Sequence, residues 1–244
     1  MKNPKVDELF QKLQNQLHAL RVRDTIFSGR TLWEYEKMFD LKINSIKDKR
    51  VLDCPAGASS FAFEAKKLGI NVIACDEIYS RNLSQLKLLG EFEIELTRQR
   101  TKLHHQIYNW DLYRSIPNLI KYRRKALKNF LKDFSDSIGS TYIHGNLSQL
   151  PFKDRTFEMV LSANLLFSYE DELDYAFHIK AIREMLRVSK QEVRIFPAEK
   201  AHGPPKFLGR ILKELKRDGV SATITTTTYE YVKGINKMLL LSKN

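Results

Sequence analysis

Two residues in the first third of the chain have types and a spacing suited to binding a nucleoside. Gly57 lies in a turn directly after the apolar run 50–54, and Asp76 ends the next apolar run about 20 residues further on. A glycine at such a turn lets the backbone approach a ligand closely, and a carboxylate after the second strand can accept hydrogen bonds from both ribose hydroxyls. Glu77 offers a second carboxylate at the same place. The spacing therefore indicates a nucleoside or dinucleotide site at the carboxyl ends of two strands.

The segments that must position these residues have the pattern of a βαβ unit. Residues 50–54 predict a short buried strand, residues 59–68 a helix that ends at Gly69, and residues 71–75 a second strand. Such units join parallel strands by a right-handed connection. The remaining elements continue the alternation, which favours a parallel sheet. We expect strands over 141–144, 157–163 and 192–196, helices over 171–188 and 207–217, and an antiparallel closing pair, 222–228 and 235–241.

Two parts of the chain exceed what a minimal sheet needs. Residues 6–20 have apolar side chains at helical spacing, and Trp33, Tyr35, Met38 and Phe39 indicate a second short helix or turn. We expect two or three helices between residues 78 and 140, the last capped by Ser115. The predicted organisation is an N-terminal helical cap, residues 1–48, and a core, residues 49–244, whose insertion at 78–140 forms a lid.

Charge and composition narrow the class of protein. The 244 residues carry a net charge of +12, and residues 78–140 supply half of it, with twelve Lys and Arg against six Asp and Glu. Tyr108, Trp110, Tyr113 and Tyr122 are interleaved with these cations, so the insertion is either an RNA-docking surface or a solvated helix face. Cys54 and Cys75 lie in apolar runs, which argues against a disulfide framework or a zinc ribbon. A signal peptide or transmembrane pattern is missing, so we expect a cytoplasmic protein of unspecified oligomeric state.

Four segments in the correct order carry a family resemblance. Residues 51–59, Val-Leu-Asp-Cys-Pro-Ala-Gly-Ala-Ser, resemble the first motif of class I S-adenosylmethionine-dependent methyltransferases, and Asp76 stands at the second-strand position. Residues 145–152, Gly-Asn-Leu-Ser-Gln-Leu-Pro-Phe, are similar to a later motif of that family, and residues 184–188 resemble the helix end before the fifth strand. The similarity covers roughly residues 49–198 without the insertion.

The resemblance implies a fold and a cofactor. The fold would be α/β, a Rossmann-like three-layer sandwich with a mostly parallel seven-stranded sheet whose last strand is antiparallel. The cofactor would be S-adenosylmethionine, with no metal. The cofactor-binding residues implied are Asp53, Pro55, Ala56, Gly57 and Ser59 at the methionine end, Asp76 and Glu77 at the ribose, Asn146 and Leu147 at the adenine, and Asn164 facing the reacting centre. Ser59 and Asn146 depart from the family pattern, which usually has a glycine and an acidic residue there.

Three functions stay open from the sequence. The first is methyl transfer to a small or medium-sized acceptor beneath the lid, the second is RNA methylation with docking on the basic insertion, and the third is a catalytically silent cofactor-binding module. A nicotinamide-binding domain is disfavoured because its turn would need three glycines where this chain has only Gly57. A general base is optional, since a sulfonium methyl group is already activated; the candidates are His202, His104 and His105.

Overall fold

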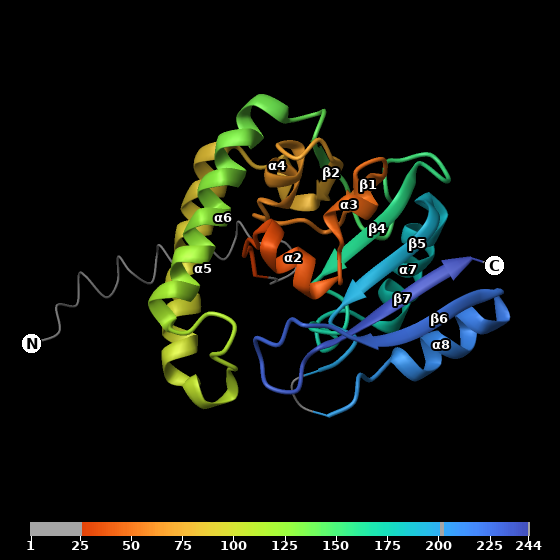
Figure 1. Cartoon of the computed structure of the whole chain (residues 1–244). Coiled ribbons are helices and arrows are strands. Elements are labelled where there is room, and N and C mark those ends of the chain that lie inside the picture. The colour runs from red at the N-terminus through yellow and green to blue at the C-terminus, as the bar shows by residue number, and fades with distance from the viewer. Residues whose placement is uncertain (1–25, 201–202, 244) are drawn as a thin grey trace, which may run out of the picture.

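The computed structural model describes residues 26–200 and 203–243 (Figure 1). The predicted amphipathic helix over residues 6–20 and the candidate His202 lie outside these described residues. Among the helices described, none has the length and apolar character needed to cross a membrane.

One seven-stranded sheet forms the centre of the molecule, in the order β3-β2-β1-β4-β5-β7-β6. Neighbouring strands from β3 to β5 are parallel, and β7 runs antiparallel to both β5 and β6. The predicted mostly parallel sheet with an antiparallel last strand is therefore confirmed. The strands are β1 (Arg50–Asp53), β2 (Asn71–Asp76), β3 (Tyr142–His144), β4 (Phe157–Ala163), β5 (Ser189–Phe196), β6 (Val220–Thr226) and β7 (Lys237–Lys243).

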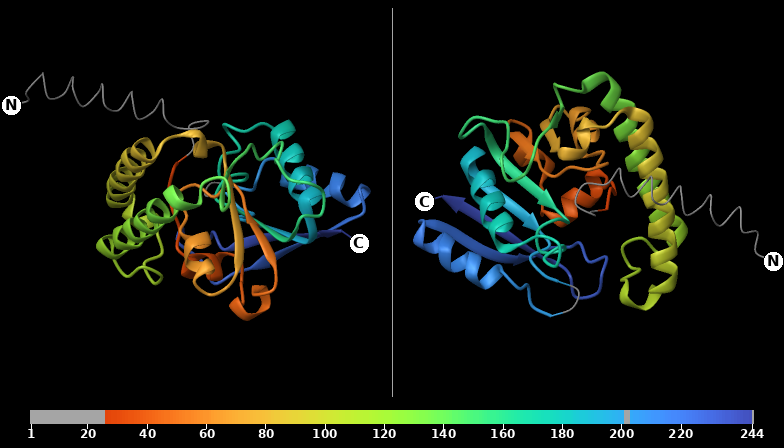
Figure 2. Two further views of the ribbon diagram at one scale, coloured as in Figure 1. Left: turned by 90° about the horizontal axis from the view of Figure 1, so that it is seen from above. Right: turned by 180° about the vertical axis from the view of Figure 1, so that it is seen from behind.

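Helices cover both faces of the sheet, which makes three layers (Figure 2). Side chains alternate across each strand, so Val51 packs into one core and Leu52 into the other. The first core lies under α2 (Leu32–Met38), α4 (Phe61–Lys66) and α6 (Ile116–Ser137), and the second lies under α7 (Tyr175–Val188) and α8 (Leu208–Arg217). The short α3 (Ile43–Ile46) leads into β1.

Two long helices, α5 (Leu83–Leu103) and α6, fill most of the segment 78–140 and pack side by side at one end of the sheet (Figures 1 and 2). Each begins at a side-chain cap. Asn82 and Gln85 form a capping box at the start of α5, and the Ser115 hydroxyl accepts from the amide of Asn118 with Pro117 in the first turn of α6. The predicted cap at Ser115 is therefore confirmed.

The connection between α5 and α6, which contains the 3₁₀ turn η2 (His105–Ile107), is bonded to the connection between β6 and β7. Tyr108 and Val232 form an isolated antiparallel bridge. The amide of Asn109 donates to the carbonyl of Tyr231 at 2.8 Å, and the amide of Lys233 donates to the carbonyl of Ile107 at 3.0 Å. The connection between α5 and α6 is therefore held to the loop between β6 and β7, the two strands at the edge of the sheet away from β3.

The boundaries of α7 and β5 differ from those predicted. The helix expected over 171–188 begins only at Tyr175, because the carboxylate of Asp174 accepts from the amide of Phe177 at 2.8 Å and caps it there. Residues 164–174 are left as a loop at the end of β4, and β5 begins at Ser189, three residues before the predicted start.

Candidate functional site

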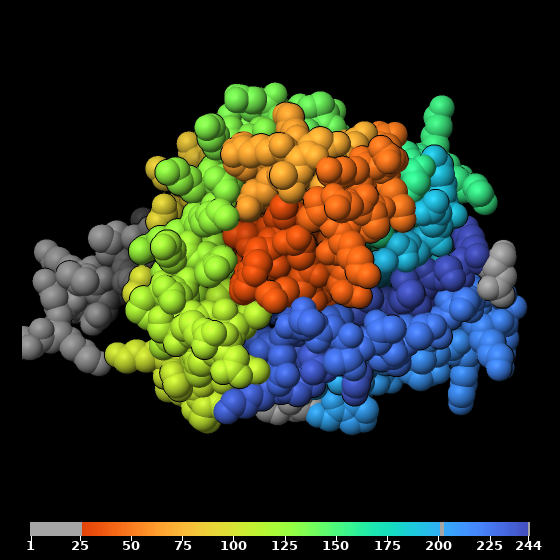
Figure 3. Space-filling view, in the orientation of Figure 1, coloured from red at the N-terminus to blue at the C-terminus, as the bar shows by residue number. Residues whose placement is uncertain are grey.

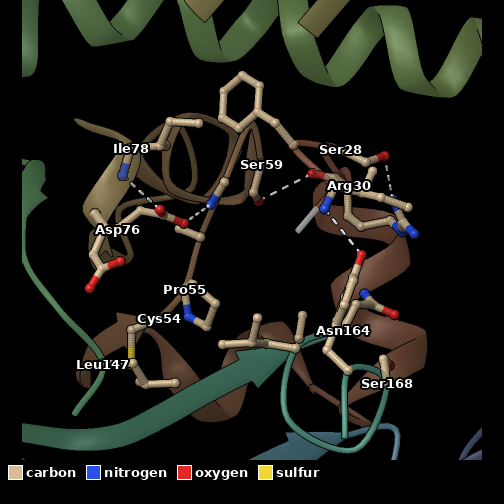
Figure 4. Close-up of a pocket in the computed structure, with 18 of the residues that line it drawn as sticks. Ser28, Arg30, Cys54, Pro55, Ser59, Asp76, Ile78, Leu147, Asn164 and Ser168 are labelled. Atoms are coloured by element: carbon tan, nitrogen blue, oxygen red, sulfur yellow. Dashed lines mark hydrogen bonds between the residues drawn. The ribbon is translucent and has the colours of Figure 1, made fainter. Parts of the chain in front are cut away.

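A cavity of about 500 Å³ lies at the carboxyl ends of β1, β2 and β4 (Figure 4). Several other segments complete its wall, among them residues 26–35, the C-terminal half of α5, residues 145–150, the loop after β4, and the connection between β6 and β7. Of the predicted site residues, the cavity lining includes Pro55, Ala56, Gly57, Ser59, Asp76, Glu77, Leu147 and Asn164. A volume of this size lies within the range of small-molecule sites.

Gly57 and Asp76 are in direct contact at one end of the cavity. The amide of Gly57 donates to Asp76 Oδ2 at 2.8 Å, and the amide of Ile78 donates to Oδ1 at 3.0 Å (Figure 4). Gly57 has a φ of +53°, which favours glycine, and its carbonyl accepts from the hydroxyl of Tyr79 at 2.8 Å. Burial raises the pKa of Asp76 to about 6, although the two backbone hydrogen bonds lower it.

Ser59 joins the glycine turn to residues 26–31, which precede α2 and are called the N-terminal segment here. Its hydroxyl donates to the carbonyl of Arg30 at 3.2 Å and accepts from the amide of Phe61 at 3.0 Å. Gly29 packs against the same turn so closely that a Cβ there would lie 2.1 Å from the carbonyl oxygen of Ala58. Gly29 is therefore a packing requirement of this site that the sequence reasoning missed.

Asp53 lies behind the cavity wall and is not among its lining residues. The carboxylate is fully buried, and the hydroxyl of Tyr35 donates to it with distances of 2.9 and 2.8 Å to its two oxygens. Burial raises the pKa of Asp53 well above its ordinary value. Tyr35 itself lines the cavity, so it separates Asp53 from the cavity space. The sequence indicated only that Tyr35 packs on the core.

The segment 145–150 forms the wall beyond Asp76. Gly145, Leu147 and Leu150 line the cavity, whereas Asn146 does not. The side-chain oxygen of Asn146 accepts from the amide and the hydroxyl of Ser148, both at 2.8 Å, which closes a local turn. The structure thus places Leu147 in the cavity wall and uses the side chain of Asn146 to shape the turn before it.

Asn164 follows the last residue of β4 and lines the cavity with Ser168 and Tyr169 (Figure 4). It has a φ of +54°, and its amide donates to the carbonyl of Phe196 at 2.6 Å, which holds it at the end of β5. Asparagine tolerates this left-handed conformation better than most residues. The hydroxyl of Tyr169 accepts from the amide of Ile26 at 3.1 Å, so the loop after β4 contacts the N-terminal segment.

A buried ion pair lies in the wall between α2 and α6. Arg123 Nη1 donates to Glu34 Oε1 at 2.6 Å, and the exposed fractions of the two side chains are 2% and 0%. Arg123 also donates to the hydroxyl of Tyr113 at 3.1 Å, and that hydroxyl donates to Glu34. Sequence reasoning counted Arg123 only among the cations of the insertion, because its partner is 89 residues away.

Neither described candidate for a general base lines the cavity. His104 follows the last residue of α5, and the ring of His105 stacks on Trp110 with centroids 4.7 Å apart. No histidine within 26–200 and 203–243 is among the lining residues. In the same part of the chain, no three His, Cys, Asp or Glu side chains are grouped so that they could hold a metal ion.

Several known proteins are similar to this chain in sequence or in fold. A family model described as a methyltransferase domain matches residues 95–196, which run from α5 through the end of β5. An uncharacterized protein of Methanocaldococcus jannaschii is 32% identical over 229 residues, which cover 93% of this chain and 100% of that protein. Gly57 and Asp76 lie outside the residues that this family model matches.

Two solved structures are similar at low identity. A TehB-like SAM-dependent methyltransferase from Corynebacterium glutamicum is 15% identical with a TM-score of 0.46, covering 99% of this chain and 100% of that one. Magnesium protoporphyrin IX methyltransferase from Synechocystis, crystallised with S-adenosylmethionine, is 13% identical with a TM-score of 0.44, covering 96% and 79%.

The family model, the order of the strands and the glycine turn opposite Asp76 agree with one another. These three observations support an active methyltransferase and do not support the third predicted function, a catalytically silent cofactor-binding module. The chain belongs to the class I S-adenosylmethionine-dependent methyltransferases, enzymes that use S-adenosylmethionine as their cofactor.

Proposed function

We propose that this methyltransferase acts on a small or medium-sized acceptor that binds beneath the helical insertion. The observation that carries the proposal is that one cavity joins Gly57 and Asp76 to Asn164 and to the wall formed by α5. Tyr108 and Tyr231, which bond the insertion to the β6–β7 connection, line the same cavity. A volume of about 500 Å³ suits a nucleoside cofactor with a compact acceptor better than it suits a polymer.

The proposed cofactor residues follow the length of the cavity. Asp76 and Glu77 would accept hydrogen bonds from the ribose hydroxyls, and Ile78 and Leu147 would enclose the adenine. The turn 55–59 would border the methionine end. Asp53 and Asn146 would act as positioning residues, because the first holds Tyr35 and the second shapes the turn before Leu147.

The residues present fit this cofactor on three structural grounds. The turn at Gly57 has no side chain where the ligand would approach, and Asp76 lines the cavity with its two oxygens fixed by backbone amides. The wall beyond them is apolar, as a purine ring requires.

Bound there, S-adenosylmethionine supplies an activated methyl group. The protein's own residues would then align the acceptor and exclude water, and Asn164, which lines the cavity at the end of β4, would orient the acceptor atom.

Calorimetry combined with labelled methyl transfer tests the proposal. S-adenosylhomocysteine should bind one to one, and label from S-adenosylmethionine should enter the small-molecule fraction of a cell extract. Label in the RNA fraction alone would contradict the proposed acceptor class. An absence of binding would contradict the site itself.

RNA methylation remains the second candidate because of one surface of α6. Lys121, Arg124, Lys128 and Lys132 recur at helical spacing, are exposed, and form no ion pair with any described residue. Such a row of cations could contact phosphates. Retention on RNA across a salt series separates the two functions, since phosphate contacts predict a steep loss of affinity as salt rises.

A further inference from the structure

Charged side chains are distributed unequally along the cavity. The lining carboxylates, Asp76 and Glu77, lie together at the proposed ribose end. The lining guanidinium groups belong to Arg30, Arg100 and Arg123, which come from the N-terminal segment, α5 and α6. Figure 4 shows Asp76 and Arg30 on opposite sides of the cavity. The lining carboxylate of Asp76 and the guanidinium group of Arg30 therefore lie on opposite sides of one cavity.

Positive charge exceeds negative charge in the buried part of this wall. Glu34 bonds Arg123 at 2.6 Å, and the same Oε1 atom lies 3.6 Å from Nε of Arg30. Burial acts to raise the pKa of Glu34, but the two guanidinium groups outweigh it, so the pKa is lowered and Glu34 is ionised. One carboxylate thus serves two cations. Arg30 Nε is itself buried and has no hydrogen-bond partner among the described residues.

Arg100 adds a third cation to the lining of the cavity. It lies on α5, is exposed, and forms no ion pair with a described residue. Thr97 and Thr101, on the same helix, also line the cavity, and the Thr101 hydroxyl lies 3.1 Å from the hydroxyl of Tyr231. The ring of Tyr231 stacks on Tyr108 with centroids 4.7 Å apart. Three guanidinium groups, two threonine hydroxyls and the rings of Tyr108 and Tyr231 therefore line the same cavity.

We propose that the methyl acceptor is a small anion whose carboxylate or phosphate group is bound between Arg30 and Arg100. The proposal rests on the proposed function and names its substrate class. Arg30 is only 15% exposed and shares the carboxylate of Glu34 with Arg123, while its Nη1 donates to the hydroxyl of Ser28 and the carbonyl of Gly29. Guanidinium groups such as those of Arg30 and Arg100 bind carboxylate and phosphate oxygens with paired hydrogen bonds. An anionic acceptor would add a second negative charge beside Arg30 and Arg123, which share the single carboxylate of Glu34.

The same chemistry has a second source, the carboxylate of the cofactor's methionine part. Two ligands separate the sources at Arg30: S-adenosylhomocysteine, which carries that carboxylate, and 5′-methylthioadenosine, which lacks the amino acid part. The measured quantity is the dissociation constant of 5′-methylthioadenosine divided by that of S-adenosylhomocysteine. If Arg30 binds the acceptor, Arg30→Gln leaves this ratio unchanged. If the ratio falls by about tenfold, the variant has lost a contact with the methionine carboxylate, which assigns Arg30 to the cofactor and overturns its acceptor role.

The first test separates the acceptors in a cell extract by charge before any reaction. Small molecules are divided on an anion-exchange column into a retained pool and a flow-through pool, and each pool is incubated with labelled S-adenosylmethionine and the full-length protein. The label should enter the retained pool. Transfer confined to the flow-through pool, or to RNA, overturns the proposal.

The second test uses inorganic phosphate as the probe with protein saturated by S-adenosylhomocysteine. Phosphate should bind, and Arg100→Gln should weaken it by about tenfold, since a charge-assisted hydrogen bond is lost. The matched control is Arg98→Gln, because Arg98 lies on the same helix, pairs with Glu95 and does not line the cavity. Equal phosphate affinity in wild type and Arg100→Gln overturns the proposal. If S-adenosylhomocysteine itself fails to bind, the proposed function fails and this inference fails with it.

Discussion

At the level of single residues, the proposed binding of the ribose depends on how the carboxylate of Asp76 is held. Its two oxygens each accept one backbone amide, and each oxygen keeps a lone pair that a ligand hydroxyl could use. The sequence predicted the meeting of Gly57 and Asp76 because both follow parallel strands in a βαβ unit, where strand ends share one edge. It could not predict that Tyr35 shields Asp53 or that Arg123 pairs with Glu34. Those contacts join residues 18 and 89 positions apart through packing, which no local pattern records.

Replacement of Asp76 by Asn should weaken S-adenosylhomocysteine binding by at least about tenfold, since a charged acceptor is lost and an amide NH₂ group can face the Gly57 amide. Isothermal titration calorimetry measures this directly. Asp136→Asn, at the exposed end of α6, is the matched control and should bind as wild type does. Equal affinity in Asp76→Asn and wild type would remove Asp76 from the site.

Cofactor affinity should also depend on pH through Asp76. Because burial raises the pKa of this carboxyl to about 6, the free protein holds it protonated below that pH, and a ligand that needs the carboxylate must displace the proton. The dissociation constant of S-adenosylhomocysteine should therefore rise as pH falls from 7 to 5 and stay nearly flat above 7. Asp76→Asn should lose this dependence over the same range, and a persistent slope in the variant would assign the titration to another group.

At the scale of elements, the insertion is attached at both ends. Its helices pack on α4 and on each other, and its connection is bonded to the β6–β7 connection through Tyr108, Asn109 and Tyr231. Sequence periodicity and capping residues predicted the last helix and its start at Ser115, because both signals are local. The contact with the β6–β7 connection could not be predicted, since it pairs two irregular segments that are far apart in the chain. The prediction that residues 78–140 form a separate lid stays a prediction.

Truncation of Tyr231 to Ala should loosen this attachment. The variant loses the stacking on Tyr108 and the contact with the Thr101 hydroxyl but keeps the backbone bonds. Amides in the connection 104–115 should exchange hydrogen faster, whereas the strands of the sheet keep their protection. Mass spectrometry of the exchange checks this. Ile224→Ala, on exposed β6, should leave residues 104–115 unchanged, and equal exchange in all three proteins would show that the attachment does not restrain the insertion.

At the scale of the whole molecule, two cores lie on opposite faces of the sheet, and a buried ion pair on the side of the first core joins α2 to the insertion. Arg123 and Glu34 connect α6 to α2, and Arg123 also donates to the carbonyl of Gly29. The fold class was predictable because alternating strands and helices leave few topologies. The cavity in Figure 4 could not be predicted in the same way, because many segments of the chain line it. Figure 3 shows residues of the N-terminal part (red), the insertion (yellow-green) and the C-terminal strands (blue) side by side on one face.

Replacement of Arg123 by Met should destabilise the protein by about 3 kcal/mol, because the carboxylate of Glu34 is left buried with Arg30 as its remaining cation. Urea denaturation measures the loss. The double variant with Glu34→Gln should recover part of it, since the buried charge is then removed. The exposed Arg124→Met serves as control and should change stability little. An unchanged midpoint in Arg123→Met would show that the cluster contributes nothing to stability.

A crystal structure with bound S-adenosylhomocysteine would decide whether the cavity is the cofactor site. The ribose hydroxyls should lie within hydrogen-bonding distance of Asp76 or Glu77, the adenine against Leu147, and the sulfur near Asn164. A nucleoside bound outside this cavity, or bound inside it with the ribose away from both carboxylates, would show that the site is assigned wrongly.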